Sequence, residues 1–187
     1  MRYLGLDLST VSTGFSIFDD EKCKDSGKIV PDKNVETMER IKFIAQYISN
    51  SFDFRFIDKV IIEDTFYQAN YLTTKMLNRL AGAVFFAIVG KKPEIKIEFV
   101  TPTAARKSVG LLPRSQKQNI VDRVNQMFNL KLELKDNDEA DGIVLGYYGY
   151  WHDHEPKEKF TDLDKGFYKT KVRSMKTPKI KKKLRRI

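Results

Sequence analysis

Alternation of apolar and polar positions divides the first thirty residues into three short strands. Tyr3–Leu8 is an apolar run, Thr13–Phe18 alternates, and a third strand is expected over Lys22–Val30. The two connecting segments, Ser9–Ser12 and Asp19–Glu21, are short enough to be turns. Three consecutive strands joined by short turns predict an antiparallel meander.

Helical spacing begins after the meander and then alternates with two further strands. The expected elements are a helix over Thr37–Phe52, a strand over Asp58–Asp64, a helix over Asn70–Val89, a strand over Lys96–Val100, and helices over Thr103–Val109, Ser115–Phe128 and Asp138–Tyr150. The inward faces of the first two helices are expected to carry Met38, Ile41, Ile44, Ala45 and Ile48, and Leu72, Met76, Leu77, Leu80, Val84 and Ile88. This order predicts an α/β fold: a mixed five-stranded sheet, three antiparallel strands followed by parallel ones, with helices on its faces. Ligands of such sheets gather near the carboxyl ends of the parallel strands.

Positive charge is concentrated at the end of the chain. Residues 157–187 hold 13 Lys and Arg against 3 Asp and Glu, a net charge of +10, whereas the whole chain has a net charge of +9. The preceding residues therefore have a net charge of −1. We expect a folded domain over residues 1–155 and a basic tail over residues 156–187. Such a tail is typical of proteins that hold a polyanion, although a solubilising extension would have the same composition.

Two features bear on the compartment. No run of about 18 consecutive apolar residues is present, and Asp7 interrupts the apolar stretch at the N-terminus, so neither a membrane span nor a secretion signal is expected. The single cysteine, Cys23, has no partner for an internal disulfide, which fits a reducing compartment. The sequence therefore predicts a cytoplasmic protein that does not act at a membrane.

Four carboxylates lie where two strands end and where the last helix begins. Asp7 stands in LGLDLS and Glu63 in VIIEDT, each at the end of an apolar strand. Asp138 and Asp141 are three residues apart and can share one face of the last helix. Taken singly, each acid could be explained by turn capping or by the helix macrodipole. We assign the neighbouring acids Asp136 and Glu139 to such a cap, as a capping-box variant.

Together the four acids predict a metal site. Hard oxygen ligands without Cys or His favour Mg²⁺, with Mn²⁺ as the second possibility. Two such ions, about 3.5–4 Å apart, activate water and stabilise the leaving oxygen in phosphodiester hydrolysis. Gly142, beside Asp141, is expected to leave room for a substrate to approach.

The motifs that carry these acids resemble those of the RuvC Holliday-junction resolvases. LGLDLSTVSTGFSIF resembles the first strand pair of that family, VIIEDTFYQAN its second acidic strand, DEADGIVLG its closing helix, and TAARKSVGLLPRSQKQNIV its basic segment. The resemblance runs from about residue 2 to about residue 150, in the family's order. This sequence departs from the pattern in the extra acid at Asp64 and in its longer, more basic tail.

The resemblance implies an RNase H-like domain, a homodimer, and cleavage of four-way junctions, forks and other branched DNA. It implies that Asp7, Glu63, Asp138 and Asp141 are catalytic metal ligands for two ions. It places Phe66 where an aromatic ring stacks on an unpaired base. It implies that DNA is contacted by Lys117 and by either Lys107 or Arg106, which are adjacent in the basic segment. Tyr71 is expected to pack in the core instead.

Two other functions fit parts of the same pattern. An RNase H-like nuclease acting on RNA or on an RNA–DNA hybrid would use the same acids. A catalytically inactive DNA-binding protein would need only the basic tail, although the presence of all four acids argues against it. The long helix Asn70–Val89 is apolar on more than one face, which predicts that it takes part in a two-fold interface.

Overall fold

The computed structural model describes residues 1–64 and 71–154. The sheet is built from β1 (Arg2–Asp7), β2 (Thr13–Asp19), β3 (Lys22–Ile29), β4 (Lys59–Glu63) and β5 (Lys96–Val100). The helices are α1 (Thr37–Ser51), α2 (Tyr71–Val89), α3 (Pro102–Ser108), α4 (Lys117–Phe128) and α5 (Asn137–His154), with short 3-10 turns η1 (Phe54–Phe56) and η2 (Leu134–Asp136). Every element expected from the sequence is present, with ends that differ by a few residues.

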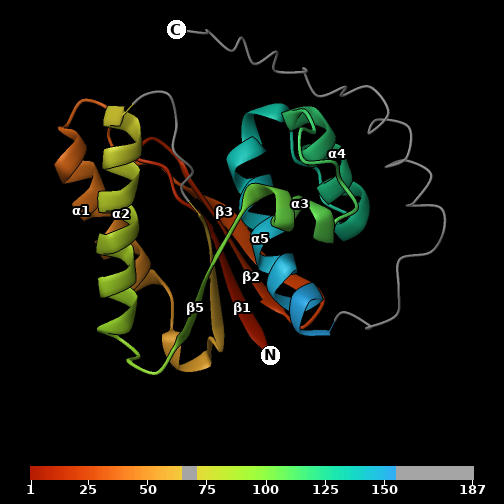
Figure 1. Cartoon of the computed structure of the whole chain (residues 1–187), viewed down its shortest axis with the longest axis horizontal. Coiled ribbons are helices and arrows are strands. Elements are labelled where there is room, and N and C mark those ends of the chain that lie inside the picture. Colours follow the sequence, from red (N-terminus) through yellow and green to blue (C-terminus); the bar gives the residue numbers. More distant parts are fainter. Residues whose placement is uncertain (65–70, 155–187) are drawn as a thin grey trace, which may run out of the picture. The chain divides into compact units, whose positions relative to one another are not determined.

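The strands form one mixed sheet in the order β3-β2-β1-β4-β5 (Figure 1). β1, β2 and β3 pair antiparallel, whereas β4 lies parallel to β1 and β5 parallel to β4. The predicted meander followed by parallel strands is therefore confirmed. Because β1, β4 and β5 run the same way, their carboxyl ends share one edge of the sheet.

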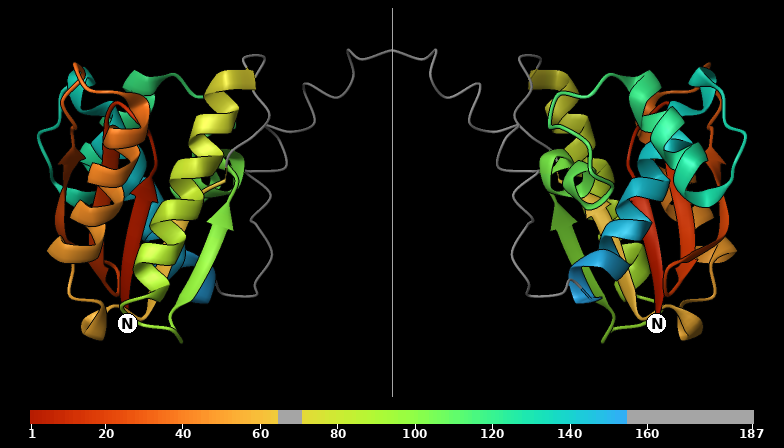
Figure 2. Two further views of the ribbon diagram at one scale, coloured as in Figure 1. Left: turned by 90° about the vertical axis from the view of Figure 1, so that its left-hand side faces the viewer. Right: turned by 90° about the vertical axis from the view of Figure 1, so that its right-hand side faces the viewer.

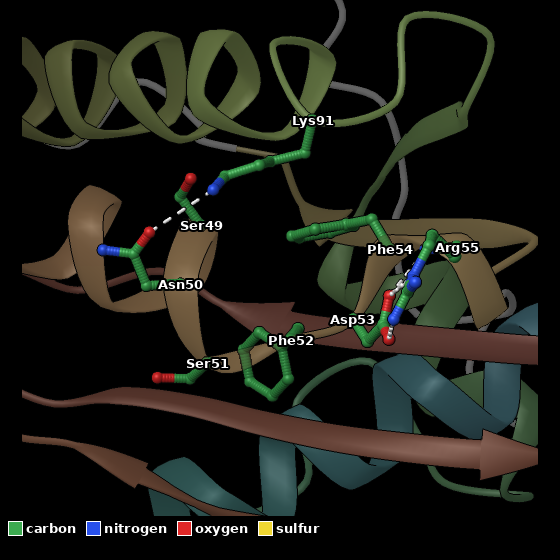
Figure 3. A pocket seen from close by; sticks show the side chains of 8 residues that line it. All are labelled: Ser49, Asn50, Ser51, Phe52, Asp53, Phe54, Arg55 and Lys91. Atoms are coloured by element: carbon green, nitrogen blue, oxygen red, sulfur yellow. Dashed lines mark hydrogen bonds and ion pairs between the residues drawn. The ribbon is translucent and has the colours of Figure 1, made fainter.

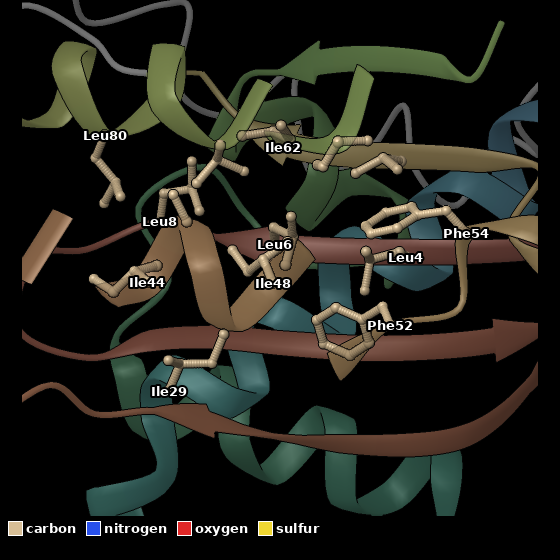
Figure 4. Packing of buried hydrophobic residues seen from close by; sticks show 14 of the residues in the cluster. Leu4, Leu6, Leu8, Ile29, Ile44, Ile48, Phe52, Phe54, Ile62 and Leu80 are labelled. Carbon is tan, nitrogen blue, oxygen red and sulfur yellow. The ribbon is translucent and has the colours of Figure 1, made fainter. Parts of the chain in front are cut away.

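The helices cover the two faces of the sheet separately. α1 and α2 lie on one face, and α3, α4 and α5 lie on the other (Figures 1 and 2). Between the sheet and the first pair lies an aliphatic core that includes Leu4, Leu6, Ile44, Ile62 and Leu80 (Figure 4). A second core lies under α5, and it includes Tyr3, Phe18, Ile61, Val124 and Val144. Alternate residues of β1 and β4 thus enter opposite cores, as a pleated strand requires.

Helical spacing predicted that Met38 and Leu72 face the core, and both predictions were wrong. Ile41, Ile44, Ala45 and Ile48 are buried as expected, but Met38 is 48% exposed. In α2 only Leu80, Val84 and Ile88 are buried, and Leu72 is 63% exposed. Both misplaced residues lie in the first turns of their helices, at the rim of the sheet, where the helical face continues beyond the core that would cover it.

α2 is long and apolar enough, by length and composition, to cross a membrane. The core helix of a soluble protein can have the same length and apolar composition. Only 22% of the apolar window is buried within the chain. The helix therefore carries apolar surface that its own sheet does not cover.

A buried cation fixes the last turn of α5 to the far edge of the sheet. Lys59, at the start of β4, is 7% exposed, and its Nζ lies 2.7 Å from Glu98 and 2.9 Å from Asp153. The hydroxyl of Tyr148 donates to Glu98 at 3.2 Å. A buried ammonium is tolerated only when carboxylates meet it. This ion-pair group holds the end of α5, so the start of the helix is aimed at the opposite edge.

Candidate active site

The ends of β1 and β4 bring two of the four predicted acids to the same level of the sheet. Leu6 lies beside Ile62 in the parallel register, and the next residues along the two strands are Asp7 and Glu63. Ile61 belongs to the core under α5. Because side chains alternate along a strand, Glu63 is directed to the same side as Ile61. Two carboxylates therefore meet on the α5 face at the carboxyl edge of the sheet.

Glycines let α5 approach β1 and β2 more closely than side chains would allow. A Cβ on Gly14 would lie 1.7 Å from the carbonyl oxygen of Asp138, and one on Gly5 would lie 2.3 Å from the amide nitrogen of Gly146. The buried hydroxyl of Ser16 donates to the carbonyl of Gly142 at 2.8 Å. Gly14 is also the strand partner of Asp7. The first turn of α5 thus lies directly over the end of β1.

Gly142 does not have the role that the sequence suggested. It is buried, and a Cβ there would lie 2.7 Å from the amide nitrogen of Phe15 and 2.8 Å from the carbonyl carbon of Gly14. The glycine makes room for β2 and not for a substrate. The expectation was wrong because the face of α5 that packs on the sheet could not be assigned from the helix alone.

The four carboxylates act on one another electrostatically. Burial is the main reason that the pKa of Asp7 lies well above its ordinary value; the charges of Glu63, Asp141 and Asp138 raise this pKa further, and the charge of Lys117 opposes them. This mutual repulsion is the behaviour of carboxylates that share one site.

The other two shifted acids have the same principal cause. Burial raises the pKa of Glu63 to about 7, the charge of Asp141 adds to the increase, and that of Arg106 opposes it. Burial also raises the pKa of Asp141, while Arg106 and Lys117 lower it. Strongly shifted carboxylates in one place are typical of functional sites.

The donor set suits a hard divalent cation in the kind of its atoms. In the ranges 1–64 and 71–154, no three Asp, Glu, His or Cys side chains are gathered closely enough to make a finished metal-binding cluster. Like charges keep carboxylates apart unless a cation lies between them. Carboxylate oxygens are the ligands that Mg²⁺ and Mn²⁺ prefer. The four carboxylates are therefore near enough to raise the pKa of Asp7, and their oxygen atoms are of the kind that Mg²⁺ and Mn²⁺ prefer.

Basic residues on α3 and α4 stand beside the acids. Lys117, the first residue of α4, donates from its Nζ to the side-chain oxygen of Asn137. Arg106 donates to the carbonyl of Pro113 at 2.9 Å, and its charge reaches Glu63 and Asp141, as described above.

Lys107 is placed differently from its neighbour. Its Nζ lies 5.9 Å from the centre of the Trp151 ring, in the last turn of α5. The charge of Arg106 lowers the pKa of both Glu63 and Asp141. The sequence left these two as alternatives, because a helix of seven residues with adjacent cations does not reveal which one faces the sheet edge.

The acids that flank the site have structural partners. Asp136 accepts from the backbone of Glu133 at 3.0 Å and is ion-paired with Lys28 at 2.8 Å. Glu139 accepts from the hydroxyl of Ser26 at 2.7 Å. Both are thus bound as structural residues, but the predicted capping box between them was wrong. The box joins Glu133 and Asp136 around η2, one turn earlier.

Two aromatic predictions have different outcomes. Phe66 lies outside the described residues, so its predicted place beside the DNA stays a prediction. Tyr71, expected in the core, is 64% exposed at the first turn of α2.

Asp64, the extra acid, is exposed beyond the end of β4, and its backbone amide donates to the carbonyl of Val100 at 2.8 Å.

The glycine and serine contacts under α5 were not predicted as part of the site. Gly5 and Gly14 were visible in the first two strands, and Gly142 and Gly146 recur four residues apart in the last helix. That recurrence is the signal that could have paired the helix with the strands. It is weak, because small residues at this spacing also occur on exposed helices.

Comparison with known proteins places the chain in a family. The family model of the crossover junction endodeoxyribonuclease RuvC matches residues 3–147. The RuvC protein of Fusobacterium nucleatum is 26% identical over 149 residues, which cover 78% of this chain and 77% of that protein. The RuvC protein of Dictyoglomus thermophilum is also 26% identical over 149 residues, covering 78% and 93%.

Solved structures share the fold at lower identity. Thermus thermophilus RuvC in complex with a Holliday junction substrate superposes with a TM-score of 0.69 at 14% identity, covering 83% of this chain and 97% of that one. The yeast mitochondrial Holliday junction resolvase gives 0.56 at 13% identity, covering 81% of each. The expected RNase H-like fold is confirmed, and the match of the family model over most of the chain shows that this protein belongs to the RuvC family of crossover junction endodeoxyribonucleases.

Proposed function

We propose that this protein is an endonuclease that cleaves Holliday junctions, and with them forks and other branched DNA, by metal-dependent hydrolysis of phosphodiester bonds. One observation carries the proposal: in a chain of the RuvC family, Asp7, Glu63 and the two acids of α5 converge on the carboxyl edge of the sheet. We place its action in the cytoplasm, in keeping with the single thiol of Cys23.

Asp7, Glu63, Asp138 and Asp141 are the residues that would hold the metal, which we propose to be two Mg²⁺ ions, with Mn²⁺ able to replace them. Such ions supply an activated water and neutralise the charge that develops on the leaving oxygen. Soft ligands are remote: Cys23 pairs with Phe18 near the other end of the hairpin, and His154 stacks on Tyr150 at the end of α5. The oxygen-only donor set therefore favours hard cations over zinc.

The basic residues have a separate part in the proposal. Arg106 and Lys117 offset the charge of the acids and can donate to phosphate oxygens of the bound strand. We assign Arg106, rather than Lys107, to the scissile phosphate, since its charge acts on two of the acids. Lys107, over Trp151, is left to contact the backbone farther along the strand. Phe66 is proposed to stack on an unpaired base at the crossover.

A substrate panel tests this function against its rivals. The wild-type chain is incubated with a labelled four-way junction, a fork, a linear duplex and an RNA–DNA hybrid, each with Mg²⁺ and with a chelator. We expect paired cuts in the junction that require the metal, weaker cutting of the fork, and intact duplex. Preferred cutting of the hybrid would instead identify an RNase H-like activity on RNA, and binding without any cut would identify a non-catalytic DNA-binding protein.

α2 offers a surface for a second copy of the chain. In its C-terminal half Phe86 is 76% exposed and Phe85 is 37% exposed. Gly82, one turn earlier, has no atom within 4 Å of where its Cβ would be. An exposed glycine in mid-helix weakens the helix, so its presence suits a place where another backbone approaches. We propose that two α2 helices meet here about a two-fold axis and that each copy cuts one strand of the junction.

Replacing Phe86 by Asp is expected to weaken the dimer by at least about 10- to 100-fold, because burying a Phe side chain contributes about 1.5–3 kcal/mol and a carboxylate would be buried in its place. Sedimentation velocity at micromolar concentration measures the change. A matched variant, Phe56→Asp, alters a ring that is 58% exposed elsewhere and should leave the dimer intact. A wild-type chain that sediments as a monomer and still makes paired cuts would contradict the proposal.

The basic tail, residues 156–187, is proposed to bind phosphates without reading bases. A chain truncated after Pro156 is expected to bind a junction with a log–log salt dependence that is flatter by several units, because each phosphate contact contributes about 0.9 to the slope. The four acids all precede the tail, so the single-turnover cleavage rate at saturating protein should change little. An unchanged slope together with a collapsed rate would mean that the tail supports the catalytic domain instead.

A further inference from the structure

The outward face of α2 is apolar in the C-terminal half of the helix and basic in the N-terminal half. Its C-terminal half is apolar, as described above, whereas its N-terminal half lines a pocket of about 490 Å³. The lining residues are Tyr71, Thr74, Lys75, Asn78 and Arg79, which we call the α2 basic surface. It contains two cations, an exposed aromatic ring, an amide and a hydroxyl, and no carboxylate.

The two cations of this surface are held by uncharged groups. The ammonium of Lys75 lies 6.0 Å from the centre of the Tyr71 ring. A guanidinium nitrogen of Arg79 lies 3.9 Å from the sulfur of Met38 and 3.8 Å from that of Met76. Within the described part of the chain, neither cation forms an ion pair with a carboxylate. An anion that arrives here displaces no ion pair formed among residues 1–64 and 71–154.

The α2 basic surface lies at the same edge of the sheet as the acids. Arg79 contacts Met38, the second residue of α1, and two residues later in that helix Arg40 donates to the carbonyl of Thr10 at 3.3 Å. Thr10 belongs to the turn that directly follows Asp7. Contacts therefore lead from the end of β1 across the start of α1 to the α2 basic surface.

The acids consequently have cations on both sides of the sheet. Arg106 and Lys117 come from α3 and α4 on one face, while Lys75 and Arg79 come from α2 on the other (Figure 1). A nucleic-acid strand that passes the acids and continues over the sheet edge would meet both groups. A DNA backbone is the ligand that this combination fits, since cations along the strand bind phosphates and an exposed ring can stack on a base.

The opposite end of the same helix lacks these properties. There a pocket of about 440 Å³ contains Lys91 and Arg55 (Figure 3). Arg55 is held by Asp53 at 2.6 Å, and Lys91 donates to the side-chain oxygen of Asn50 at 3.4 Å. This pocket has an acid in its lining and lies at the edge of the sheet away from Asp7. Lys91 from this pocket and Lys96, the exposed first residue of β5, supply matched cations for a control.

We propose that the α2 basic surface binds the sugar–phosphate backbone of a DNA strand that leaves the active site toward the α1–α2 face. Lys75 and Arg79 contact successive phosphates, Asn78 donates to a phosphate or sugar oxygen, and Tyr71 stacks on an exposed base or packs on a sugar. The inference rests on the proposed function and adds a second DNA contact region to it. One helix would then carry both the dimer contact and a backbone contact.

The test uses the full-length chain with both cations replaced, Lys75→Ala with Arg79→Ala. Binding to a labelled four-way junction is measured in a chelator across a salt series. The log–log slope is expected to flatten by about 1.8, since each lost phosphate contact contributes about 0.9, and the affinity at low salt should fall roughly 10- to 100-fold. The single-turnover rate in Mg²⁺ at saturating protein should stay close to that of the wild type.

Matched variants make the result specific. Lys91→Ala with Lys96→Ala removes the same charge from exposed positions at the opposite edge and should keep the wild-type slope. Lys75→Arg with Arg79→Lys keeps the charge and should also keep the slope. If the salt-dependence slope of the Lys91 and Lys96 variant flattened equally, the proposal would be overturned. The loss of net charge would then explain the effect without a specific contact.

Two further outcomes would also overturn it. One is an unchanged slope in the Lys75 and Arg79 variant. The other is conversion of that variant to a monomer, by sedimentation, with its slope preserved, which would assign these residues to the dimer contact. A wild-type chain that shows the expected difference in slope but cuts no substrate in Mg²⁺ would count against the proposed function alone.

Discussion

Replacing Asp7 by Asn is expected to abolish cleavage of a four-way junction while leaving junction binding nearly unchanged. The substitution keeps the size of the side chain and removes one negative charge from the four carboxylates that we propose bind the metal. Loss of one preorganised electrostatic group in an active site commonly costs about 10²–10³-fold in rate, and a lost metal ligand should cost at least as much. The measurement is the single-turnover rate in Mg²⁺ at saturating protein, with binding followed separately in a chelator.

The same substitution is expected to stabilise the metal-free protein. Asp7 is buried among like charges that hold its pKa well above the ordinary value, and an amide has no charge to bury. The thermal midpoint of Asp7→Asn in a chelator should therefore exceed that of the wild type near neutral pH. Added Mg²⁺ or Mn²⁺ should raise the midpoint of the wild type and have little effect on the variant, because only the wild type keeps the full set of ligands.

The raised pKa values of Asp7 and Glu63 predict how the folding stability of the metal-free protein depends on pH. The folded chain holds protons on Asp7 and Glu63 that the unfolded chain releases above about pH 4, and the pKa of Glu63 is raised to about 7. Folding stability without metal should therefore decrease as the pH rises through this window. The decrease in stability with pH should be shallower in Asp7→Asn.

For the cleavage prediction, full activity of Asp7→Asn in Mg²⁺ would refute the assignment of Asp7 to the metal site.

Replacing Gly14 by Ala is expected to damage the site without altering any acid. The new Cβ would lie 1.7 Å from the carbonyl oxygen of Asp138 and 2.5 Å from its carbonyl carbon, so the first turn of α5 must move away from β2. Overpacking of this kind costs about 1–3 kcal/mol of folding stability. The displacement would also carry Asp138 and Asp141 away from Asp7. We expect cleavage to fall by at least about tenfold and the Mg²⁺ concentration required to increase.

Gly149 provides the control for loss of stability alone. It belongs to α5 itself, nearer the far edge of the sheet, and a Cβ there would be 2.6 Å from the Tyr3 ring and 3.0 Å from Ile61. Gly149→Ala should destabilise the fold to a similar degree and keep its cleavage rate at a temperature where both variants are folded. Equal cleavage rates in the Gly14 and Gly149 variants would show that the close approach at Gly14 does not position the acids.

Local patterns in the sequence were sufficient to predict the sheet and the helices. Alternation over Thr13–Phe18 and helical spacing over Thr37–Phe52 depend on near neighbours, and the hydrophobic effect acts on each such segment in the same way in most folds. The acidic motifs could be recognised for a similar reason. A carboxylate at the end of an apolar strand is costly to bury, so Asp7 and Glu63 stand out from their surroundings.

The tertiary structure alone decided which faces of the helices meet the sheet and which remain outside. Gly142 was expected beside a substrate and lies against β2, while Tyr71 and Met38 were expected inside and are exposed. The charge of Arg106 acts on Glu63 whereas Lys107 lies over Trp151, and this difference depends on the orientation of α3. Each of these depends on contacts between residues far apart in the chain. The spacing along one helix specifies a stripe of residues, but the partner of that stripe is chosen by packing against strands elsewhere in the sequence.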